Sequence, residues 1–344
     1  MAEAATRRGH GAKGLEYYIA MPSYHVTVSD SVFPNLDPAR QVLATIGAEL
    51  RMADTPTPEG IVAAASSSDA LLVTYAKITA DMIRNMPKCR VISRFGIGVD
   101  NVDIEAATAA SIVVTKVPDY CIDEVSDHAM ALLLAVVRKI PSSSARTHSG
   151  RWEMKAVVPI HRLRGSVLGL AGFGRIPQLV APKAQAFGMK VIAYDPFIPA
   201  DVFARANVEQ VDLKTLITTS DYVSVHTPLT PETKGLFNRD TFGQMKRGAY
   251  IVNTARGPII DEAALAEALD SGQIAGAALD VMTQEPPPSS PLFGRDNVII
   301  TPHTSFYSEE SLVELQVKAA QEVVAVLSGR SPRNPVNPEV LAQR

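Results

Sequence analysis

Short apolar runs alternate with amphipathic runs along the first third of the chain. β-branched and apolar residues are concentrated in four expected strands, at 25–30, 70–75, 89–93 and 112–115. Apolar residues at helical spacing predict three helices, over 38–50, 78–86 and 104–110. Because strands and helices alternate, this part of the chain is expected to form a parallel sheet covered by helices.

A second series of strands is expected after Gly165. These runs are almost continuously apolar, which indicates strands that are buried on both faces of a doubly wound parallel sheet. They lie at 166–172, 189–195, 221–227, 248–254, 275–281 and 297–303. Helical segments separate most of them, so the predicted fold class is α/β.

Two helices stand out by their pattern. Residues 122–140 are apolar enough to predict a helix packed between domains or subunits, ended by Pro141 and a Ser-rich break. The last helix is expected to open at Ser308, with two glutamates in its first turn, where carboxylates suit the helix dipole. The Pro- and Asn-rich tail after Gly329 is predicted to be a surface segment.

Composition limits the function classes. The chain has 344 residues, more than one average domain, and its 33 Lys and Arg against 36 Asp and Glu give a net charge of −3. Without a basic excess, no direct nucleic-acid contact is predicted. The longest apolar run, Ala129–Val137, is far shorter than the roughly 20 residues of a membrane-spanning helix, so no membrane partner is predicted.

The cysteines and the first residues indicate the cellular setting. Cys89 and Cys121 lie outside any Cys-x-x-Cys or Cys/His cluster, so neither a disulfide framework nor a metal site is expected. Residues 1–23 are interpreted as a leader, because their first part lacks the apolar core of a secretory signal. The expected setting is reducing and cytoplasmic.

A dinucleotide-binding turn is predicted where the segment GFGRI (172–176) follows a strand and precedes a helix. The first glycine allows a tight bend, the second lets a pyrophosphate approach the backbone, and the helix N-terminus offers free N–H groups. Asp195 ends the next strand, 21 residues past Gly174, where a carboxylate binds ribose hydroxyls and repels a 2′-phosphate. NAD is therefore favoured over NADP.

Two prolines depart from the usual dinucleotide-binding pattern. Pro177 stands where a third glycine is usual, and proline is tolerated in a first helical turn because that N–H has no partner within the helix. Pro182 lies deeper and is expected to kink or shorten the helix. The amides of Arg175 and Ile176 remain, so the predicted cofactor site is retained.

Three further motifs lie at predicted carboxyl ends of strands, the edge at which open α/β sheets bind ligands. They are NTARG (253–257), LDV (279–281) followed by QEP (284–286), and TPH (301–303). Reduction of a 2-oxo acid needs a cation for the carboxylate, a proton donor for the carbonyl oxygen and a hydride. Arg256 offers a planar fork for a carboxylate, His303 offers an acid/base group, and Glu285 can bind the other nitrogen of that imidazole.

These motifs in this order, behind GFGRI, YDP and VHTPLTPETKG, resemble the D-isomer-specific 2-hydroxyacid dehydrogenase family over about Tyr75 to Gly329. In that family the Arg binds the substrate carboxylate, the His is the acid/base and the Glu is its partner, roles that fall on Arg256, His303 and Glu285. Asp280 matches a family residue near the nicotinamide amide. Together with the glycine turn, the resemblance assigns cofactor contacts to Gly172, Gly174, Arg175, Ile176, Asp195, His226, Thr227, Pro228, Thr233, Thr254, Ala255, Asp280 and Ser305. It assigns substrate contacts to Tyr75, Arg94, Gly96, Ile97, Gly98 and Phe306.

Within that family the chain is most similar to the C-terminal binding proteins, which are dehydrogenase-like transcriptional corepressors, and to their bacterial relatives. The segments VTYAKIT (73–79), RFGIGVDNVDI (94–104) and PHTSFYSEES (302–311) carry this likeness. The branch has a Trp three positions after the catalytic His, where this chain has Phe306. A Phe still offers an aromatic wall to an apolar substrate side chain.

The resemblance implies two Rossmann-like or flavodoxin-like domains. Residues 24–123 and 305–330 would form a discontinuous substrate-binding domain, 124–304 the NAD-binding domain, and 331–344 a tail. Relatives are usually homodimers built around the NAD domain. A homodimer that uses the helix at 122–140 and the segment near Trp152 is therefore expected.

The main functional prediction is an NAD-dependent dehydrogenase of a small D-2-hydroxy acid. Two other classes stay open: hydride chemistry on formate or phosphite, and an NAD(H)-sensing, corepressor-like scaffold with weak or vestigial activity. Formate enzymes carry Gln in place of the partner of the His, so Glu285 argues against formate but not against phosphite. An enzyme whose cofactor binding is impaired by Pro177 and Pro182 is a further alternative.

Overall fold

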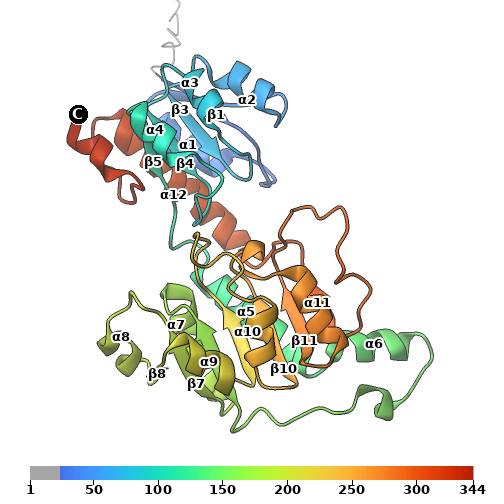
Figure 1. The fold of residues 1–344 in the computed structure, drawn as a ribbon. Coiled ribbons are helices and arrows are strands. Elements are labelled where there is room, and N and C mark those ends of the chain that lie inside the picture. Colours follow the sequence, from blue (N-terminus) through green and yellow to red (C-terminus); the bar gives the residue numbers. More distant parts are fainter. Residues whose placement is uncertain (1–23, 344) are drawn as a thin grey trace, which may run out of the picture.

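The computed structural model describes residues 24–343, which form two lobes, each built on a parallel sheet (Figure 1). The first lobe has five strands in the order β2-β1-β3-β4-β5, and its central strand is buried along its whole length. Its strands are β1 (Tyr24–Val28), β2 (Ala48–Met52), β3 (Ala70–Val73), β4 (Val91–Arg94) and β5 (Val113–Thr115). Its first four helices are α1 (Asp37–Ala44), α2 (Pro58–Ala65), α3 (Ala80–Arg84) and α4 (Ile104–Ala109). The predicted α/β class is confirmed.

The second lobe has seven strands in the order β12-β11-β10-β9-β6-β7-β8. Its strands are β6 (Val167–Ala171), β7 (Lys190–Tyr194), β8 (Glu209–Gln210), β9 (Tyr222–Val225), β10 (Ala249–Asn253), β11 (Ile274–Leu279) and β12 (Val298–Ile300). Its α-helices are α5 (Ile122–Val137), α6 (Ile140–His148), α7 (Arg175–Ala186), α8 (Ala200–Arg205), α9 (Leu213–Thr219), α10 (Arg239–Gln244) and α11 (Glu262–Asp270). Short 3₁₀ helices occur at Met154–Val157 and Gly257–Ile259.

The chain crosses between the lobes twice. It leaves the first lobe after β5 and enters the second through α5, then returns after β12 into α12 (Glu309–Leu327). α12 packs against α1 and β4, and the hydroxyl of Ser93 donates to the carbonyl of Ala319 at 3.1 Å. Ser308 caps this helix, because its hydroxyl accepts the N–H of Ser311 at 2.9 Å. The domain boundaries near residues 123 and 304 stay predictions.

The helix predicted over 38–50 is too long. α1 ends at Ala44, Gly47 takes a positive φ of 67°, and the chain then enters β2. Residue pairs from Tyr24↔Ala48 to Val28↔Met52 join β2 to β1. The open edge of β1 offered a ladder of backbone hydrogen bonds, which outweighed the helical spacing of a short apolar run.

The long apolar helix also ends earlier than predicted. α5 stops at Val137, and Lys139 turns the chain with a positive φ of 54°. Pro141 then lies in the first turn of α6, where its missing N–H costs nothing, so the Ser-rich segment is helical rather than a break. α5 packs against α7, β10 and β11 within its own lobe.

Pro182 does not shorten α7, which continues to Ala186. Pro177 lies in the first turn of the same helix and is buried. The helix begins at the glycine turn and is not shortened by Pro182, so of the two expected effects, a kink or a shorter helix, the shorter helix is wrong.

The C-terminal tail is not a surface segment throughout. Val336 donates its N–H to the carbonyl of Val114 at 2.7 Å, so the tail lies along the edge of β5. The buried side chain of Asn337 accepts the N–H of Val114 at 2.7 Å and donates to the carbonyl of Ile112 at 2.9 Å. A last 3₁₀ helix spans Pro338–Gln343. These bonds cover an otherwise open strand edge.

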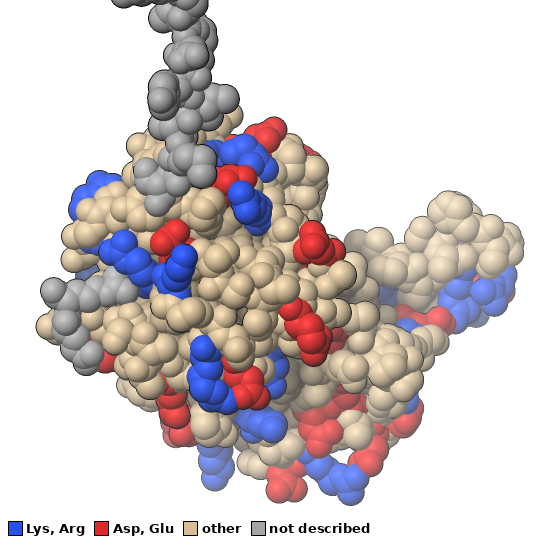
Figure 2. Space-filling view, turned by 90° about the horizontal axis from the view of Figure 1, so that it is seen from above, with Lys and Arg blue, Asp and Glu red and all other residues tan. Residues whose placement is uncertain are grey.

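The predicted leader, residues 1–23, lies outside the described residues. Within 24–343 no helix combines the length and the apolar character that crossing a membrane requires. The same residues contain no cluster of three or more His, Cys, Asp or Glu side chains suited to a metal ion. Positive and negative side chains are interspersed over the face of the molecule shown in Figure 2.

Candidate active site

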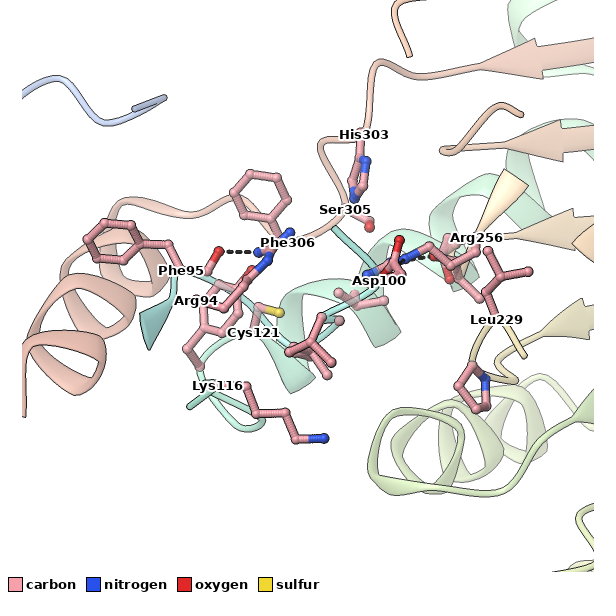
Figure 3. Close-up of a pocket in the computed structure, with 18 of the residues that line it drawn as sticks. Arg94, Phe95, Asp100, Lys116, Cys121, Leu229, Arg256, His303, Ser305 and Phe306 are labelled. Carbon is pink, nitrogen blue, oxygen red and sulfur yellow. Dashed lines mark hydrogen bonds and ion pairs between the residues drawn. The ribbon is translucent and has the colours of Figure 1, made fainter. Parts of the chain in front are cut away.

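One cleft between the lobes is lined by the carboxyl ends of strands from both sheets. β6 and β9 are neighbours in the second sheet, but the chain continues from β6 to β7 on one side and from β9 to β10 on the other. In open α/β sheets, ligands bind at the carboxyl ends of two strands where the strand order reverses in this way. Two adjoining cavities of about 590 and 880 Å³ occupy the cleft. Tyr75, Arg94, Asp100, Arg256 and His303 line both of them. Figure 3 labels the last four of these among the residues that line one cavity.

The glycine turn begins where β6 ends. Gly172 has a φ of 97°, and a Cβ on it would lie 2.9 Å from the backbone of His226, so the close approach of β6 and β9 requires glycine. A Cβ on Gly174 would meet nothing within 4 Å. α7 starts directly afterwards, and the N–H groups of Arg175 and Ile176 lie in its first turn, where helical acceptors are lacking. An anion can therefore approach this turn.

Asp195 follows β7 and is held by the backbone on both sides. Its two carboxylate oxygens accept the N–H groups of Phe173 and Phe197, each at 2.9 Å. A carboxylate oxygen can accept more than one hydrogen bond, so Asp195 stays able to bind ribose hydroxyls beside the glycine turn.

Residues after β9 and β10 form the opposite wall of the cleft. His226 lies 2.8 Å from the hydroxyl of Ser224 through its Nε2, and burial lowers the pKa of its imidazole to about 3. The buried hydroxyls of Thr227 and Thr254 have no hydrogen-bond partner within the described protein. Buried hydroxyls without partners are uncommon, so these two fit a bound ligand that carries many polar groups, such as a dinucleotide.

Arg256 follows β10 and is fixed by two acceptors. Its Nε lies 3.1 Å from Oδ1 of Asp100, and its Nη1 donates to the carbonyl of Ala255 at 2.8 Å. Burial alone would raise the pKa of the Asp100 carboxyl, but the charge and hydrogen bond of Arg256 hold it below its ordinary value. The guanidinium thus stands charged in the cleft with part of its donor set unused.

His303 and Glu285 form an ion pair at the rim of the same cleft. Nδ1 of His303 lies 2.6 Å from Oε2 of Glu285, whose other oxygen accepts the N–H of Met282 at 2.9 Å. The pair fixes the orientation of the imidazole, and its Nε2 is the nitrogen left to exchange a proton with a ligand.

Asp280 is completely buried under the turn that carries His303. Its carboxylate accepts the N–H groups of Thr304 and Ser305, each at 2.9 Å, and the hydroxyl of Thr301 at 2.6 Å. Its carbonyl accepts the N–H of His303 at 2.8 Å, and His303 itself has a φ of 53°. A non-glycine residue in this left-handed conformation needs such a surrounding to hold it. Asp280 therefore shapes the turn that carries His303.

Tyr75, Phe306 and Arg94, which are predicted to contact the substrate, all line the cleft. The rings of Tyr75 and Phe306 lie 5.6 and 6.1 Å from the imidazole of His303. Arg94 donates to the carbonyl of Phe95, and its buried Nε has no partner among the described residues. Burial lowers the pKa of the Arg94 guanidinium. Figure 3 shows its side chain within the pocket, next to Phe306, whereas Lys116 points away from His303.

The cleft brings together most of the residues predicted for the site. Ile97, Gly98, Ile176, Pro228, Ala255 and Ser305 line it as well. Gly96 is not among the residues that line the two cavities. Its lack of a side chain leaves room for Arg94, because a Cβ there would overlap the guanidinium. The hydroxyl of Thr233 donates to the carbonyl of Pro228 at 2.6 Å and so shapes the loop after β9.

Sequence reasoning overlooked Asp100 as a site residue. It lies two positions after Gly98, in the segment predicted to contact the substrate. Its partner Arg256 is 156 positions away in the chain. Only the folding of both lobes brings them together. Tyr120 and Cys121, at the crossover before α5, also line the cleft without having been predicted.

The chain is similar to known proteins along most of its length. A family model described as the NAD binding domain of the D-isomer specific 2-hydroxyacid dehydrogenases matches residues 130–305. The chain is 41% identical over 306 residues to the D-3-phosphoglycerate dehydrogenase of Methanocaldococcus jannaschii, which covers 88% of this chain and 58% of that protein. The human D-3-phosphoglycerate dehydrogenase is 40% identical over 318 residues, covering 92% and 59%. The chain thus spans a little under three fifths of the length of these curated relatives.

Solved structures share the whole architecture. The TT0316 protein of Thermus thermophilus superposes with a TM-score of 0.82 at 35% identity, covering 91% of this chain and 99% of that one. The D-lactate dehydrogenase of Aquifex aeolicus, complexed with NAD and lactic acid, has a TM-score of 0.82 at 28% identity, covering 91% and 98%.

Proposed function

Because this chain belongs to the D-isomer specific 2-hydroxyacid dehydrogenase family, we propose that it interconverts a small D-2-hydroxy acid and its 2-oxo acid with NAD as cofactor. The observation that carries this proposal is the His303–Glu285 pair, which lies in one cleft with the guanidinium of Arg256. A cation and a fixed acid/base group in one cavity are what reduction of a 2-oxo carboxylate needs from the protein.

His303 is the group that donates and accepts the proton in the proposed reaction. In the direction of reduction, Nε2 of the imidazolium gives its proton to the carbonyl oxygen of the 2-oxo acid while the carbonyl carbon accepts a hydride. In the direction of oxidation, the neutral imidazole takes the hydroxyl proton back. Glu285 stabilises the imidazolium through its contact with Nδ1 of 2.6 Å, so the proton stays available at the nitrogen that faces the substrate.

Arg256 binds the carboxylate and orients the carbonyl. Its unused Nη donors face the cleft beside the Gly98 loop, and a carboxylate accepts two such donors side by side. The Nε of Arg94, which has no partner among residues 24–343, offers a further donor to the same substrate. Both groups hold the 2-oxo acid with its carbonyl oxygen turned to His303.

The reduced cofactor supplies the hydride when it is bound. The groups that would hold it are the amides of the glycine turn, Asp195 and the hydroxyls of Thr227 and Thr254. Asp280 would set the position of the catalytic turn relative to the nicotinamide.

The side chain of the substrate is expected to lie against aromatic rings. Tyr75 and Phe306 flank the imidazole of His303, which favours an apolar or flat group on the 2-oxo acid. The curated relatives are named for D-3-phosphoglycerate, so a phosphorylated 2-oxo acid belongs in the same substrate panel.

A second copy of this chain is the proposed partner. Trp152 and Met154 are 89% and 77% exposed, in a segment outside both sheets, and large apolar side chains exposed close together in the chain favour an interface. Trp152→Ser is expected to weaken the dimer in light-scattering measurements; a wild-type monomer would contradict the proposal. A cytoplasmic location is proposed from the two free, buried cysteines.

The test is oxidation of NADH in the presence of glyoxylate, pyruvate, hydroxypyruvate, its phosphate ester, phenylpyruvate and a thioether 2-oxo acid. His303→Ala serves as the inactive variant, and binding of NADH is titrated separately for both proteins. Efficient turnover of one acid, lost in the variant while NADH binding remains, supports the proposal.

Other outcomes overturn it. If NADH binds and no 2-oxo acid is reduced, the dehydrogenase function is wrong. Phosphite and formate are then tested as hydride donors, and a peptide partner whose affinity changes with NADH would indicate a binding scaffold. If NADH does not bind, the cofactor site at the Pro177 turn is wrong.

A further inference from the structure

Asp100 in the first lobe accepts a hydrogen bond from Arg256 in the second lobe, the residue proposed to bind the substrate carboxylate. It lies in the loop after β4 of the first lobe, whereas Arg256 follows β10 of the second. Oδ1 of Asp100 lies 3.1 Å from Nε of Arg256, and Figure 3 shows this contact among the side chains that line the pocket. The Arg256 side chain is 23% exposed and that of Asp100 46%, so the pair is partly shielded from water.

The guanidinium of Arg256 uses only part of its hydrogen-bond donors within the protein. A guanidinium has five N–H groups. Nε is bound to Asp100, and Nη1 donates to the carbonyl of Ala255. Nη2 lies over Gly98, since a Cβ on that residue would be 1.8 Å from it. Asp100 thus occupies one edge of the guanidinium and leaves the Nη end for the substrate.

The charge of Asp100 acts on the same ligand. Arg256 and Arg94 hold the pKa of its carboxyl below the ordinary value against the effect of burial, so it is a carboxylate at neutral pH. A 2-oxo acid that binds the Nη end brings a second carboxylate to the same guanidinium. The two anions repel each other across one cation.

We propose that Asp100 is a positioning residue with two separable effects: its oxygen holds Arg256 in place, and its charge weakens the binding of the substrate carboxylate. This inference rests on the proposed function, because it assumes that Arg256 receives a carboxylate. Weakened binding has a use in catalysis, since a substrate or product held too tightly leaves slowly.

Two substitutions separate the effects. Asp100→Asn keeps an oxygen that accepts from Nε but removes the charge. Asp100→Ala removes both, so Arg256 keeps only its bond to the carbonyl of Ala255. Asp100→Glu restores the charge, and Asp201→Asn, which breaks a surface pair with Arg205, is the matched control outside the cleft. Thermal unfolding of each variant establishes that it is folded.

The primary measurement is calorimetric binding of oxamate, a 2-oxo acid analogue that cannot be reduced, to the enzyme saturated with NADH. The Asn variant is expected to bind oxamate about 5-fold more tightly than the wild type, the size of effect typical of one partly exposed charge. The Glu variant and Asp201→Asn are expected to bind it like the wild type.

Kinetics with the best 2-oxo acid gives the second readout. The Ala variant is expected to lose about 10-fold in kcat, because a guanidinium held only by the carbonyl of Ala255 orients the substrate carbonyl poorly. The Asn variant is expected to keep kcat within about 2-fold. If the Asp100–Arg256 pair only stabilised the fold, the substitutions would change thermal stability. The Asn and Ala variants would then not differ in their effects on KM and kcat.

The inference is overturned if the Asn variant binds oxamate as weakly as the wild type or more weakly. It is also overturned if the Asn and Ala variants have the same kcat. Failure of the proposed function looks different: the wild type then binds NADH but neither binds oxamate nor reduces any 2-oxo acid, and the role of Asp100 falls with it.

Discussion

Glu285 binds two different groups through its two carboxylate oxygens, since Oε2 lies 2.6 Å from Nδ1 of His303 and Oε1 accepts the N–H of Met282 at 2.9 Å. One oxygen anchors the carboxylate to its own loop, and the other orients the imidazole. The imidazole, which is the proposed acid/base group, is thereby held in one orientation, and a fixed orientation favours proton transfer.

Glu285→Gln is expected to slow the reduction of the best 2-oxo acid by about 10- to 100-fold, because a neutral amide cannot stabilise the imidazolium. The affinity for NADH should be unchanged in a binding titration. The double variant with His303→Ala should be no slower than His303→Ala alone, because the glutamate acts through the histidine. A Gln variant with the wild-type rate would contradict the assignment.

Gly98→Ala is expected to raise KM for the 2-oxo acid by more than about 10-fold, because the new Cβ would lie 1.8 Å from Nη2 of Arg256 and force the guanidinium to move. Gly243→Ala in α10 is the matched control, since nothing lies within 4 Å of the added atom. Steady-state kinetics of the three proteins tests this. Equal KM values would show that Arg256 does not bind the substrate in this position.

His226 makes stability depend on pH. Burial lowers the pKa of its imidazole from 6.5 to about 3, so below pH 6.5 the unfolded chain binds a proton that the folded chain does not. Stability is therefore fully present above pH 6.5 and falls toward pH 3, with a slope of at most about 1.4 kcal/mol per pH unit from this group.

Urea unfolding across that pH range measures the slope. His226→Gln should flatten it, whereas His148→Gln, on the exposed surface of α6, should leave it close to that of the wild type. An unchanged slope in the His226 variant would mean that the imidazole is solvated in the folded protein.

Both cysteines are expected to be unreactive in the folded protein. Burial raises the pKa values of Cys89 and Cys121 to about 12, so at pH 8 only about one thiol in 10⁴ is ionised. Ellman's reagent should therefore label neither thiol in the native state and both after denaturation. Thr218→Cys adds an exposed thiol as a positive control. Rapid labelling of native Cys121 would contradict this and would indicate an activated thiol in the cleft.

Strands buried on both faces were predicted well because a continuous apolar run has few alternatives. β3 and β9, for example, lie within the runs at 70–75 and 221–227. The end of the helix predicted over 38–50 was predicted poorly, because Ala48–Met52 fits a helix face and a strand equally well in isolation. The strand formed because β1 offered it an edge.

The sequence by itself determined the α/β class and the positions of the glycine turn and of the NTARG, EP and TPH motifs, because these depend on local spacing and on chemistry carried by single residues. Tertiary structure decided the rest. It set Asp100 against Arg256 across 156 positions, placed Asp280 under the turn that carries His303 and docked Asn337 on the edge of β5. Such contacts lie between residues far apart in the chain, and no local pattern encodes the packing of the two lobes that brings them within hydrogen-bond distance.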